Sequence, residues 1–244
     1  MALIVIPARM GAQRLPGKPL LAETGKPLVV HALEAARRAR CAKRVVVATD
    51  EKRIAEAVRK AGGEAVMTSP DCRSGTDRVA EAARALPGED LVLNVQGDEP
   101  EIDPVALDAL ASAMEADPST EMGTLAAPIA DKADLAAPQV VKVVADARGF
   151  ALYFSRSPIP FRRDPAGPAA ALRHVGVYAY RREFLARFAT LPQTPLERTE
   201  VLEQLRALEH GARIRVVAAD RAPPGVDTRE DYEAFVRRWR ERNP

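Results

Sequence analysis

The sequence predicts an α/β fold with a doubly wound, mostly parallel sheet, into which a hairpin is inserted. Three observations predict it. Short apolar runs alternate with helix-like segments, a turn signature interrupts this alternation in the second half, and charged residues directly follow the apolar runs. Open sheets of this class bind ligands at the carboxyl ends of their strands, so the charged residues also predict where the site lies.

The first half of the chain supplies the parallel strands. Four apolar runs indicate strands at residues 3–6, 44–48, 64–67 and 91–95. Helical patterns separate these runs at residues 29–40, 54–60 and 76–86. One further helix is predicted over residues 104–116.

The second half departs from strict alternation. Asp146-Ala147-Arg148-Gly149 is a turn signature, which predicts a hairpin between residues 140–144 and 150–154. Residues 157–171, rich in Pro, Gly and Ala, predict a mobile loop. Strands are also expected at residues 122–129, 175–179 and 214–218, and a helix at residues 196–208. A last helix is predicted to start at Thr228 with a capping-box spacing.

Length and composition bound the architecture. With 244 residues, of which 47% are hydrophobic, the chain is long enough to bury one substantial core. We therefore expect residues 1–244 to form one domain, with an extension at about 138–180. That extension is expected either to cover the substrate or to contact a second subunit.

The charge balance and the cysteines exclude several classes of protein. The 36 Lys and Arg nearly balance the 34 Asp and Glu, giving a net charge of +2, which argues against a dedicated nucleic-acid or anionic-membrane binder. Cys41 and Cys72 lack metal-site spacing and suit a reduced compartment. Without a signal-peptide pattern or an apolar run of ~20 residues, a soluble intracellular protein is predicted. The arginines of the last helix are expected to form a solvated face: Arg237, Arg238, Arg240 and Arg242.

The loop after the first strand, within residues 5–20, is the most informative segment. Arg9, Arg14 and Lys18 place three cations in it, while Gly11 and Gly17 let the backbone approach a ligand closely. This predicts a polyphosphate cradle. The pattern is neither the Walker loop nor the dinucleotide fingerprint. The alternative is an ordinary strand-to-helix turn with solvated basic residues.

Two carboxylates predict a magnesium site. Asp98 follows the strand at residues 91–95, where it can reach a metal ion above the sheet. Asp227 lies just before the last helix, and the turn there can present it to the same pocket. Mg²⁺ needs only one or two carboxylates when phosphate oxygens and water complete its shell. Taken alone, Asp227 is equally well explained as an anion at a helix N-terminus.

A third cluster opens the helix predicted at residues 76–86. Ser74-Gly75-Thr76-Asp77-Arg78 offers backbone N–H groups, small hydroxyls and a guanidinium that can hold a base or a ribose. The same composition is explained without a ligand if Ser74 or Thr76 caps the helix.

Together these motifs resemble those of the CMP-Kdo synthetases, the 3-deoxy-manno-octulosonate cytidylyltransferases. The resemblance rests on five segments in the family's order: residues 7–19, 74–76, 94–100 (NVQGDEP), 151–156 (ALYFSR) and 225–228 (GVDT). It runs from residue 3 to about residue 235. It implies a Rossmann-like nucleotidyltransferase that transfers CMP from CTP to the anomeric hydroxyl of 3-deoxy-D-manno-octulosonate (Kdo). The products would be pyrophosphate and CMP-Kdo for lipopolysaccharide biosynthesis, made by a cytoplasmic homodimer.

The resemblance also implies roles for individual residues. The nucleotide would contact Ala8, Arg9, Arg14, Lys18, Ser74 and Arg78, and the catalytic groups would be Lys18, Arg9 and Asp98. Mg²⁺ would be held by Asp98 and Asp227. The sugar acid would contact Gln96, Arg156, His174, Tyr178, Glu203 and Gln204. From the residues alone, His174 is more often a satisfied strand-end histidine than a ligand contact, and Glu203 and Gln204 are explained as solvated helix positions.

Two departures and three alternatives accompany the resemblance. Ala12 stands where the family usually carries a serine, and the 157–172 connection is compact. The alternatives are a cytidylyltransferase for another acidic sugar, such as 8-amino-Kdo or a sialic acid, a non-catalytic nucleotide-binding regulatory protein, and a dinucleotide-dependent oxidoreductase. The regulatory protein would be expected to lack Lys18 or one of the aspartates, and the oxidoreductase needs a glycine fingerprint that this chain lacks.

Overall fold

The chain folds into two compact units. The computed structural model describes residues 1–11, 14–129, 131–164 and 170–243. Unit 1 comprises residues 1–108 and 223–244, and unit 2 comprises residues 109–222. Among the helices within the described ranges, none has both the length and the apolar character needed to cross a membrane.

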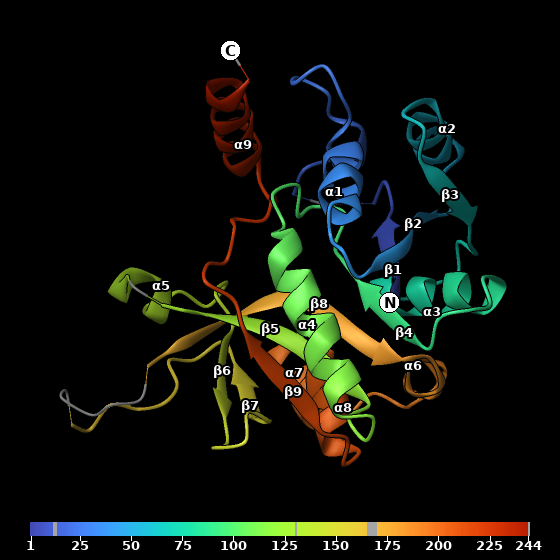
Figure 1. The fold of residues 1–244 in the computed structure, drawn as a ribbon. Coiled ribbons are helices and arrows are strands. Elements are labelled where there is room, and N and C mark those ends of the chain that lie inside the picture. The colour runs from blue at the N-terminus through green and yellow to red at the C-terminus, as the bar shows by residue number, and fades with distance from the viewer. Residues whose placement is uncertain (12–13, 130, 165–169, 244) are drawn as a thin grey trace. The chain divides into compact units, whose positions relative to one another are not determined.

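Unit 1 contains a parallel sheet of four strands in the order β3-β2-β1-β4 (Figure 1). The strands are β1 (Ala2–Ala8), β2 (Ala42–Thr49), β3 (Glu64–Met67) and β4 (Leu91–Asn94). All three pairings between them are parallel. Every residue of β1 and β4 is buried, which explains why these strands are continuous apolar runs. The predicted doubly wound, mostly parallel sheet is confirmed.

The helices of unit 1 differ in how they begin, and only some of them have a capping side chain. They are η1 (Lys18–Leu20), α1 (Leu28–Arg37), α2 (Lys52–Lys60), α3 (Gly75–Ala85) and α9 (Arg229–Arg242), while α4 (Pro104–Ala116) runs across the boundary at residue 108. The Thr228 side chain accepts a hydrogen bond from the Asp231 N–H, and the Asp231 side chain accepts one from the Thr228 N–H. This reciprocal pair is the predicted capping box.

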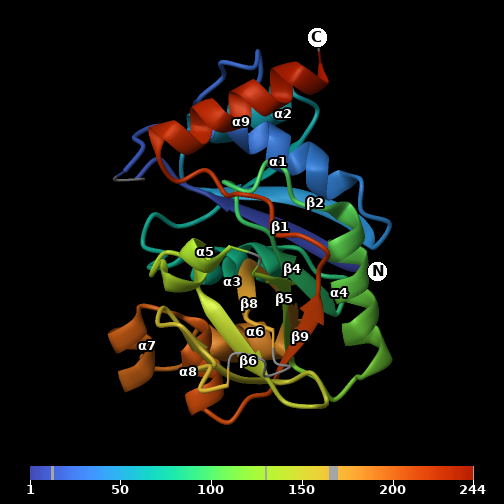
Figure 2. The same cartoon turned by 90° about the vertical axis from the view of Figure 1, so that its left-hand side faces the viewer.

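Helix α9 packs alongside α1 (Figure 2). Tyr232 and Phe235 of α9 are buried with Leu28 of α1, and the backbone N–H of Glu23 donates to the Tyr232 hydroxyl at 2.8 Å. The expectation that all four arginines of this helix are solvated holds for Arg237, Arg240 and Arg242, which are exposed, whereas Arg238 is half-buried. Arg238 and Arg242 both form ion pairs with Glu101, and Arg240 donates to the Glu23 carbonyl. These partners lie far away in sequence, so no local pattern could reveal them.

The buried His31 of α1 predicts a dependence of stability on pH. Burial lowers the pKa of His31 to about 4, and Lys26 lowers it further. The folded state therefore resists protonation that the unfolded chain accepts below pH ~6.5. The contribution of neutral His31 to the free energy of unfolding is complete above that pH and is lost progressively as the pH falls towards 4. In urea denaturation, the free energy of unfolding of the parent should fall more steeply with acid than that of His31→Gln, by up to ~1.4 kcal/mol per pH unit. Equal slopes would contradict this assignment.

Unit 2 contains a mixed sheet and the predicted hairpin. Its strands are β5 (Met122–Pro128), β6 (Lys142–Ala145), β7 (Ala151–Ser155), β8 (Leu172–Arg181) and β9 (Ile214–Ala218). Strand β5 pairs antiparallel with β8 and parallel with β9, while β6 pairs antiparallel with both β7 and β8. The turn between β6 and β7 is confirmed: Gly149 has φ 80°, and its N–H donates to the Asp146 carbonyl. Residues 165–169 of the predicted mobile loop lie outside the described residues, as does Ala12.

The predicted helix at residues 196–208 is wrong as a single element. The structure has α7 (Pro195–Glu200) and α8 (Gln204–Glu209), separated by Val201 with φ 54°. The guanidinium of Arg156 donates to the carbonyls of Glu200 and Val201 at 2.7 and 3.3 Å. These tertiary hydrogen bonds satisfy carbonyls at the end of α7, so they support a break that a β-branched residue disfavours. Two further short helices of unit 2 were not predicted: α5 (Lys132–Ala136) and α6 (Arg182–Phe188).

An ion pair within unit 2 is almost completely buried. The Arg206 and Glu197 side chains are each 6% exposed and form two hydrogen bonds, Nε to Oε2 at 2.8 Å and Nη2 to Oε1 at 2.5 Å. The guanidinium carbon also lies 5.1 Å from the centre of the Phe188 ring. Arg206 lies in α8 and Glu197 in α7, so this pair fastens the two helices together.

Candidate functional site

Unit 1 holds a cleft of about 630 Å³ at the carboxyl ends of its strands. Strand β1 ends at Ala8 and β4 at Asn94, and both strands lead into loops that line the cleft. The lining residues are Pro7, Ala8, Arg9, Gly11, Arg14, Lys18, Pro19, Ser74, Gly75, Arg78, Gln96, Gly97, Asp98 and Asp227. The structure therefore brings together every predicted nucleotide and metal residue, with Gln96 among them.

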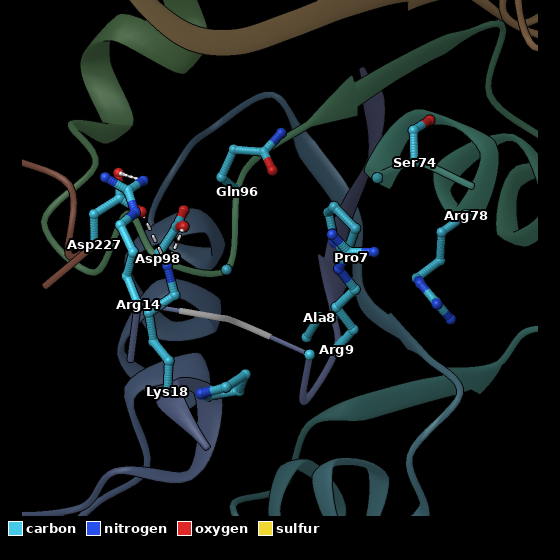
Figure 3. A pocket seen from close by; sticks show the side chains of 14 residues that line it. Pro7, Ala8, Arg9, Arg14, Lys18, Ser74, Arg78, Gln96, Asp98 and Asp227 are labelled. Atoms are coloured by element: carbon cyan, nitrogen blue, oxygen red, sulfur yellow. Dashed lines mark hydrogen bonds and ion pairs between the residues drawn. The ribbon is translucent and has the colours of Figure 1, made fainter. Parts of the chain in front are cut away.

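One end of the cleft is a cluster of opposite charges (Figure 3). The Lys18 ammonium lies 2.7 Å from the Asp98 carboxylate and 3.3 Å from the Asp227 carboxylate, and it donates to the Val226 carbonyl at 2.9 Å. The Arg14 guanidinium lies 3.0 Å from the other oxygen of Asp227. Lys18 thus joins two carboxylates that are far apart in the sequence.

A backbone contact fixes Asp227 beside Asp98. The N–H of Val226 donates to the Asp98 carbonyl at 2.9 Å, so the segment before α9 is tied directly to the loop after β4. The Asp227 N–H donates to Asp231 in the first turn of α9, which fixes the turn that carries the carboxylate. Asp227 is therefore both close to a helix N-terminus and part of the cleft.

The charged end of the cleft has the donor chemistry that Mg²⁺ prefers. The Asp98 and Asp227 carboxylates converge on one ammonium, and their side chains are 32% and 52% exposed. Within the described residues, no group of three His, Cys, Asp or Glu side chains could hold a metal ion. A site with two carboxylates and open positions suits an ion that takes the rest of its ligands from water and phosphate.

The other end of the cleft contains Ser74 and Arg78 (Figure 3). The Ser74 hydroxyl accepts from the Asp77 N–H at 3.1 Å, so the capping role is present, and Ser74 lines the cleft as well. Arg78 is 2% exposed; its guanidinium donates to Thr68 and lies 3.3 Å from Asp50. These contacts hold a buried cation in one orientation at the cleft wall.

The loop after β4 passes close to the end of β1 at Gly97. A Cβ atom at Gly97 would lie 3.1 Å from the Pro7 carbonyl oxygen and 3.7 Å from the Ala8 Cβ. That approach is tighter than normal packing allows, so a side chain here would push the two loops of the cleft apart. The neighbouring Gln96 donates to the Asn94 side chain at 3.1 Å.

Three of the predicted sugar-acid residues come together in unit 2. The Tyr178 hydroxyl donates to the Gln204 side-chain oxygen at 3.1 Å, and the ring centres of His174 and Tyr178 are 5.4 Å apart. Burial lowers the pKa of His174 to about 3. Burial, with support from the Glu203 carboxylate, raises the pKa of Tyr178 well above its ordinary value. Both side chains are therefore neutral at pH 7.

The other predicted sugar-acid residues are placed differently. The Arg156 guanidinium contacts three carbonyls, those of Pro138, Glu200 and Val201. Glu203 lies 3.4 Å from the Arg206 guanidinium. Gln96 belongs to unit 1 and the other five residues to unit 2. Contacts of all six with a sugar acid stay a prediction.

Two residues that sequence reasoning missed support the unit 2 group. Thr124 of β5 contacts His174, with 3.0 Å between its hydroxyl and Nε2. The Lys142 ammonium is completely buried and donates to the carbonyls of Ala137, Val140 and Arg156. Both lie in strands where a single polar residue among apolar ones gives no distinctive signal.

Comparison with known proteins identifies the family of this chain. The cytidylyltransferase family model matches residues 3–214. A 3-deoxy-manno-octulosonate cytidylyltransferase of Anaeromyxobacter sp. (strain Fw109-5) is 54% identical over 94% of this chain and 93% of its own. One of Syntrophotalea carbinolica is 50% identical over 96% and 97%. The solved structure of a CMP:2-keto-3-deoxy-manno-octonic acid synthetase complexed with CTP matches with a TM-score of 0.94, 44% identity and 99% coverage of each chain. The chain therefore belongs to the cytidylyltransferase family and, within it, to the 3-deoxy-manno-octulosonate cytidylyltransferases, as its motifs had predicted.

Proposed function

We propose that this chain transfers CMP from CTP to the anomeric hydroxyl of Kdo, with Mg²⁺ held by Asp98 and Asp227. The products are pyrophosphate and CMP-Kdo, the activated sugar for lipopolysaccharide biosynthesis. The observation that carries the proposal is the single cleft in which Lys18 and Arg14 meet those two carboxylates. It is the arrangement that a metal-bound triphosphate requires.

The cations of the cleft bind the triphosphate. Arg9, Arg14 and Lys18 line the cleft and come from one loop, so they can contact successive phosphates of one nucleotide. Ser74 and Arg78, at the opposite end, contact the cytidine. Ala8, at the end of β1, lets the nucleotide approach the backbone. This division places the reacting phosphate between the cationic loop and the helix that carries Ser74.

Nucleotidyltransferases typically depend on a metal ion, and the two carboxylates of this cleft fit magnesium. When bound, Mg²⁺ supplies positive charge that offsets the negative charge of the phosphate oxygens. Lys18, Arg9 and Arg14 stabilise the charge that builds up on the departing pyrophosphate. The anomeric hydroxyl attacks the α-phosphorus in line, and the bond to the pyrophosphate oxygen breaks. No covalent link to the protein is needed.

The sugar acid binds through the unit 2 group. His174, Tyr178 and Gln204 supply neutral polar groups, while Arg156 and Glu203 supply charge. A homodimer built through the β6–β7 hairpin, which the family resemblance implies, is part of the same proposal.

Release of pyrophosphate by the purified protein tests the proposal. With CTP and Mg²⁺, we expect release when Kdo is offered, and none when EDTA removes the metal. 8-Amino-Kdo and N-acetylneuraminate are offered in parallel reactions as matched acceptors. If pyrophosphate were released with 8-amino-Kdo or N-acetylneuraminate but not with Kdo, the protein would still be a cytidylyltransferase, and the proposal of Kdo as its substrate would be wrong. CTP binding without release for any acid would indicate a non-catalytic nucleotide-binding protein.

A further inference from the structure

Thr124 contacts more hydrogen-bonding groups than one hydroxyl proton can serve. Its hydroxyl oxygen lies 2.8 Å from the Val177 carbonyl, 3.3 Å from the Val175 carbonyl and 3.0 Å from Nε2 of His174. The residue is fully buried, so water does not offer an alternative partner. A hydroxyl has one proton to donate, and carbonyl oxygens only accept. The proton of Thr124 is therefore directed to the carbonyls.

An irregularity in the sheet creates this arrangement. Along β5, Thr124 pairs with Tyr178 and the next residue, Leu125, pairs with Val175. Two residues of β8 are thus left without a partner on β5, and the strand bulges there. The hydroxyl of Thr124 donates to the carbonyls at this bulge. This hydrogen bonding explains why a buried strand carries a polar side chain here.

The hydrogen-bond count determines which nitrogen of His174 carries the proton. Because the Thr124 proton is used on a carbonyl, its oxygen can contact Nε2 favourably only if Nε2–H donates to it. Burial lowers the pKa of His174 to about 3, so the ring carries a single proton at pH 7. Nδ1 then bears a lone pair. Within the described chain, no hydrogen bond reaches Nδ1.

We propose that Thr124 is a positioning residue that holds His174 as the neutral Nε2–H tautomer, so that His174 accepts a hydrogen bond from a hydroxyl of the sugar acid through Nδ1 and does not bind its carboxylate. The part that concerns the sugar rests on the proposed function, whereas the tautomer follows from the contacts alone. A lone pair attracts a hydroxyl proton and repels a carboxylate oxygen.

The neighbouring groups have matching polarity. The Tyr178 hydroxyl gives its proton to the Gln204 side-chain oxygen, so towards a ligand it also acts as an acceptor. The side-chain nitrogen of Gln204 is buried and has no partner among the described residues. The group therefore offers two acceptors for sugar hydroxyls and one amide donor for an oxygen of the acid.

Nitrogen NMR on ¹⁵N-histidine-labelled protein tests the tautomer directly. The chain has only three histidines, so its spectrum is simple. His31 is an internal reference, because Thr24 contacts its Nε2 at 2.7 Å and donates to the Lys26 carbonyl in the same way. We expect His174 at pH 7 to be neutral with its proton on Nε2, and its Nδ1 signal to shift when Kdo is added. A charged His174, or one with its proton on Nδ1, would overturn the inference.

Two substitutions of Thr124 test its role in binding. Thr124→Val keeps the shape and removes the hydroxyl, whereas Thr124→Ser keeps the hydroxyl. We expect Thr124→Val to raise the KM for Kdo about tenfold, with kcat and the KM for CTP within about twofold of the parent, and Thr124→Ser to behave like the parent. The His31 and His210 signals, unchanged in both variants, report an intact fold of unit 1 and unit 2 respectively.

The outcomes separate this inference from the proposed function. An unchanged KM for Kdo in Thr124→Val, or equal impairment in Thr124→Ser, would overturn the positioning role while the parent's activity still supported cytidylyl transfer. A parent that releases no pyrophosphate with Kdo would contradict the proposed function and with it the contact to the sugar. The parent's spectrum decides the tautomer in either case, including one in which Thr124→Val fails to fold.

Discussion

Asp98→Asn is expected to fold like the parent and to retain about 1% of its turnover or less. The substitution keeps the shape of the side chain and removes its negative charge, so the cleft loses half of the carboxylate pair that fits Mg²⁺. Loss of one such electrostatic contact typically raises the barrier by ~3 kcal/mol, on the order of a hundredfold in rate. We expect few other single substitutions in this chain to lower its turnover as much.

The geometry also explains why the fold should survive. An asparagine oxygen can still accept the hydrogen bond that Lys18 now gives to Asp98 at 2.7 Å, and Lys18 keeps its contact with the Val226 carbonyl. The backbone contact from Val226 to the carbonyl of residue 98 does not involve the side chain. Circular dichroism and thermal unfolding should therefore match the parent.

Pyrophosphate release at saturating CTP and Kdo measures the effect. Asp220→Asn is the matched control, since it makes the same chemical change at an exposed carboxylate outside the cleft, and it should keep parental turnover. If Asp98→Asn kept more than half of the parent's turnover, Asp98 would have no place in the mechanism.

Glu197→Ala is expected to destabilise the protein by about 3–5 kcal/mol. The substitution leaves the Arg206 guanidinium buried without its main counter-charge, and removing one partner of a buried ion pair typically costs that much. The contact of Arg206 with Glu203, three residues away in the sequence and 3.4 Å in distance, offsets only a part of this cost. Urea denaturation followed by circular dichroism measures the difference in the free energy of unfolding.

Two comparisons show whether burial is the cause. Glu121→Ala removes the partner of Arg187 in a pair whose side chains are 39% and 57% exposed, and it should cost no more than ~1 kcal/mol. The double variant Glu197→Leu/Arg206→Met removes both buried charges and should recover much of the lost stability. Equal costs for Glu197→Ala and Glu121→Ala would contradict the assignment.

The same pair responds to acid in a defined direction. Burial works to raise the pKa of Glu197, but the hydrogen bonds from Arg206 outweigh it and hold the pKa below its ordinary value. The ionised Glu197 carboxylate therefore contributes to the free energy of unfolding above pH ~4.3. This contribution is lost as the pH falls towards the lower pKa of Glu197 in the folded state. The difference in stability between the parent and Glu197→Ala should narrow over that range.

The cleft was predictable because the sheet topology brings the loops that line it to one edge. Parallel strands end at the same edge of a sheet, so Arg9, Lys18 and Asp98, which follow β1 and β4, were expected to meet. Asp227 was open to two explanations from local sequence, and its tie to the Asp98 carbonyl is a contact between distant segments. The structure shows that Asp227 lines the cleft, and the metal role that the family motif implies stays a prediction.

The errors have a common physical origin in long-range hydrogen bonds. Val201 interrupts a helical pattern in a conformation that β-branched residues disfavour, and the supporting donor, Arg156, lies 45 positions away. Thr124 gave no signal, because its role depends on a bulge in β8 that only the paired strands define. Periodicity records which face of an element is buried, and it carries no information about a donor supplied by another part of the chain.

The order of the chain has a consequence for how such an enzyme diversifies. The chain leaves unit 1 at residue 108 and returns to it at residue 223, so unit 2 is an insert within a discontinuous unit. The predicted nucleotide and metal residues all belong to the host unit, and five of the six predicted sugar-acid residues belong to the insert. With these predicted roles, mutations that alter acceptor choice can accumulate in one uninterrupted stretch of gene, while the residues predicted to bind CTP stay unchanged.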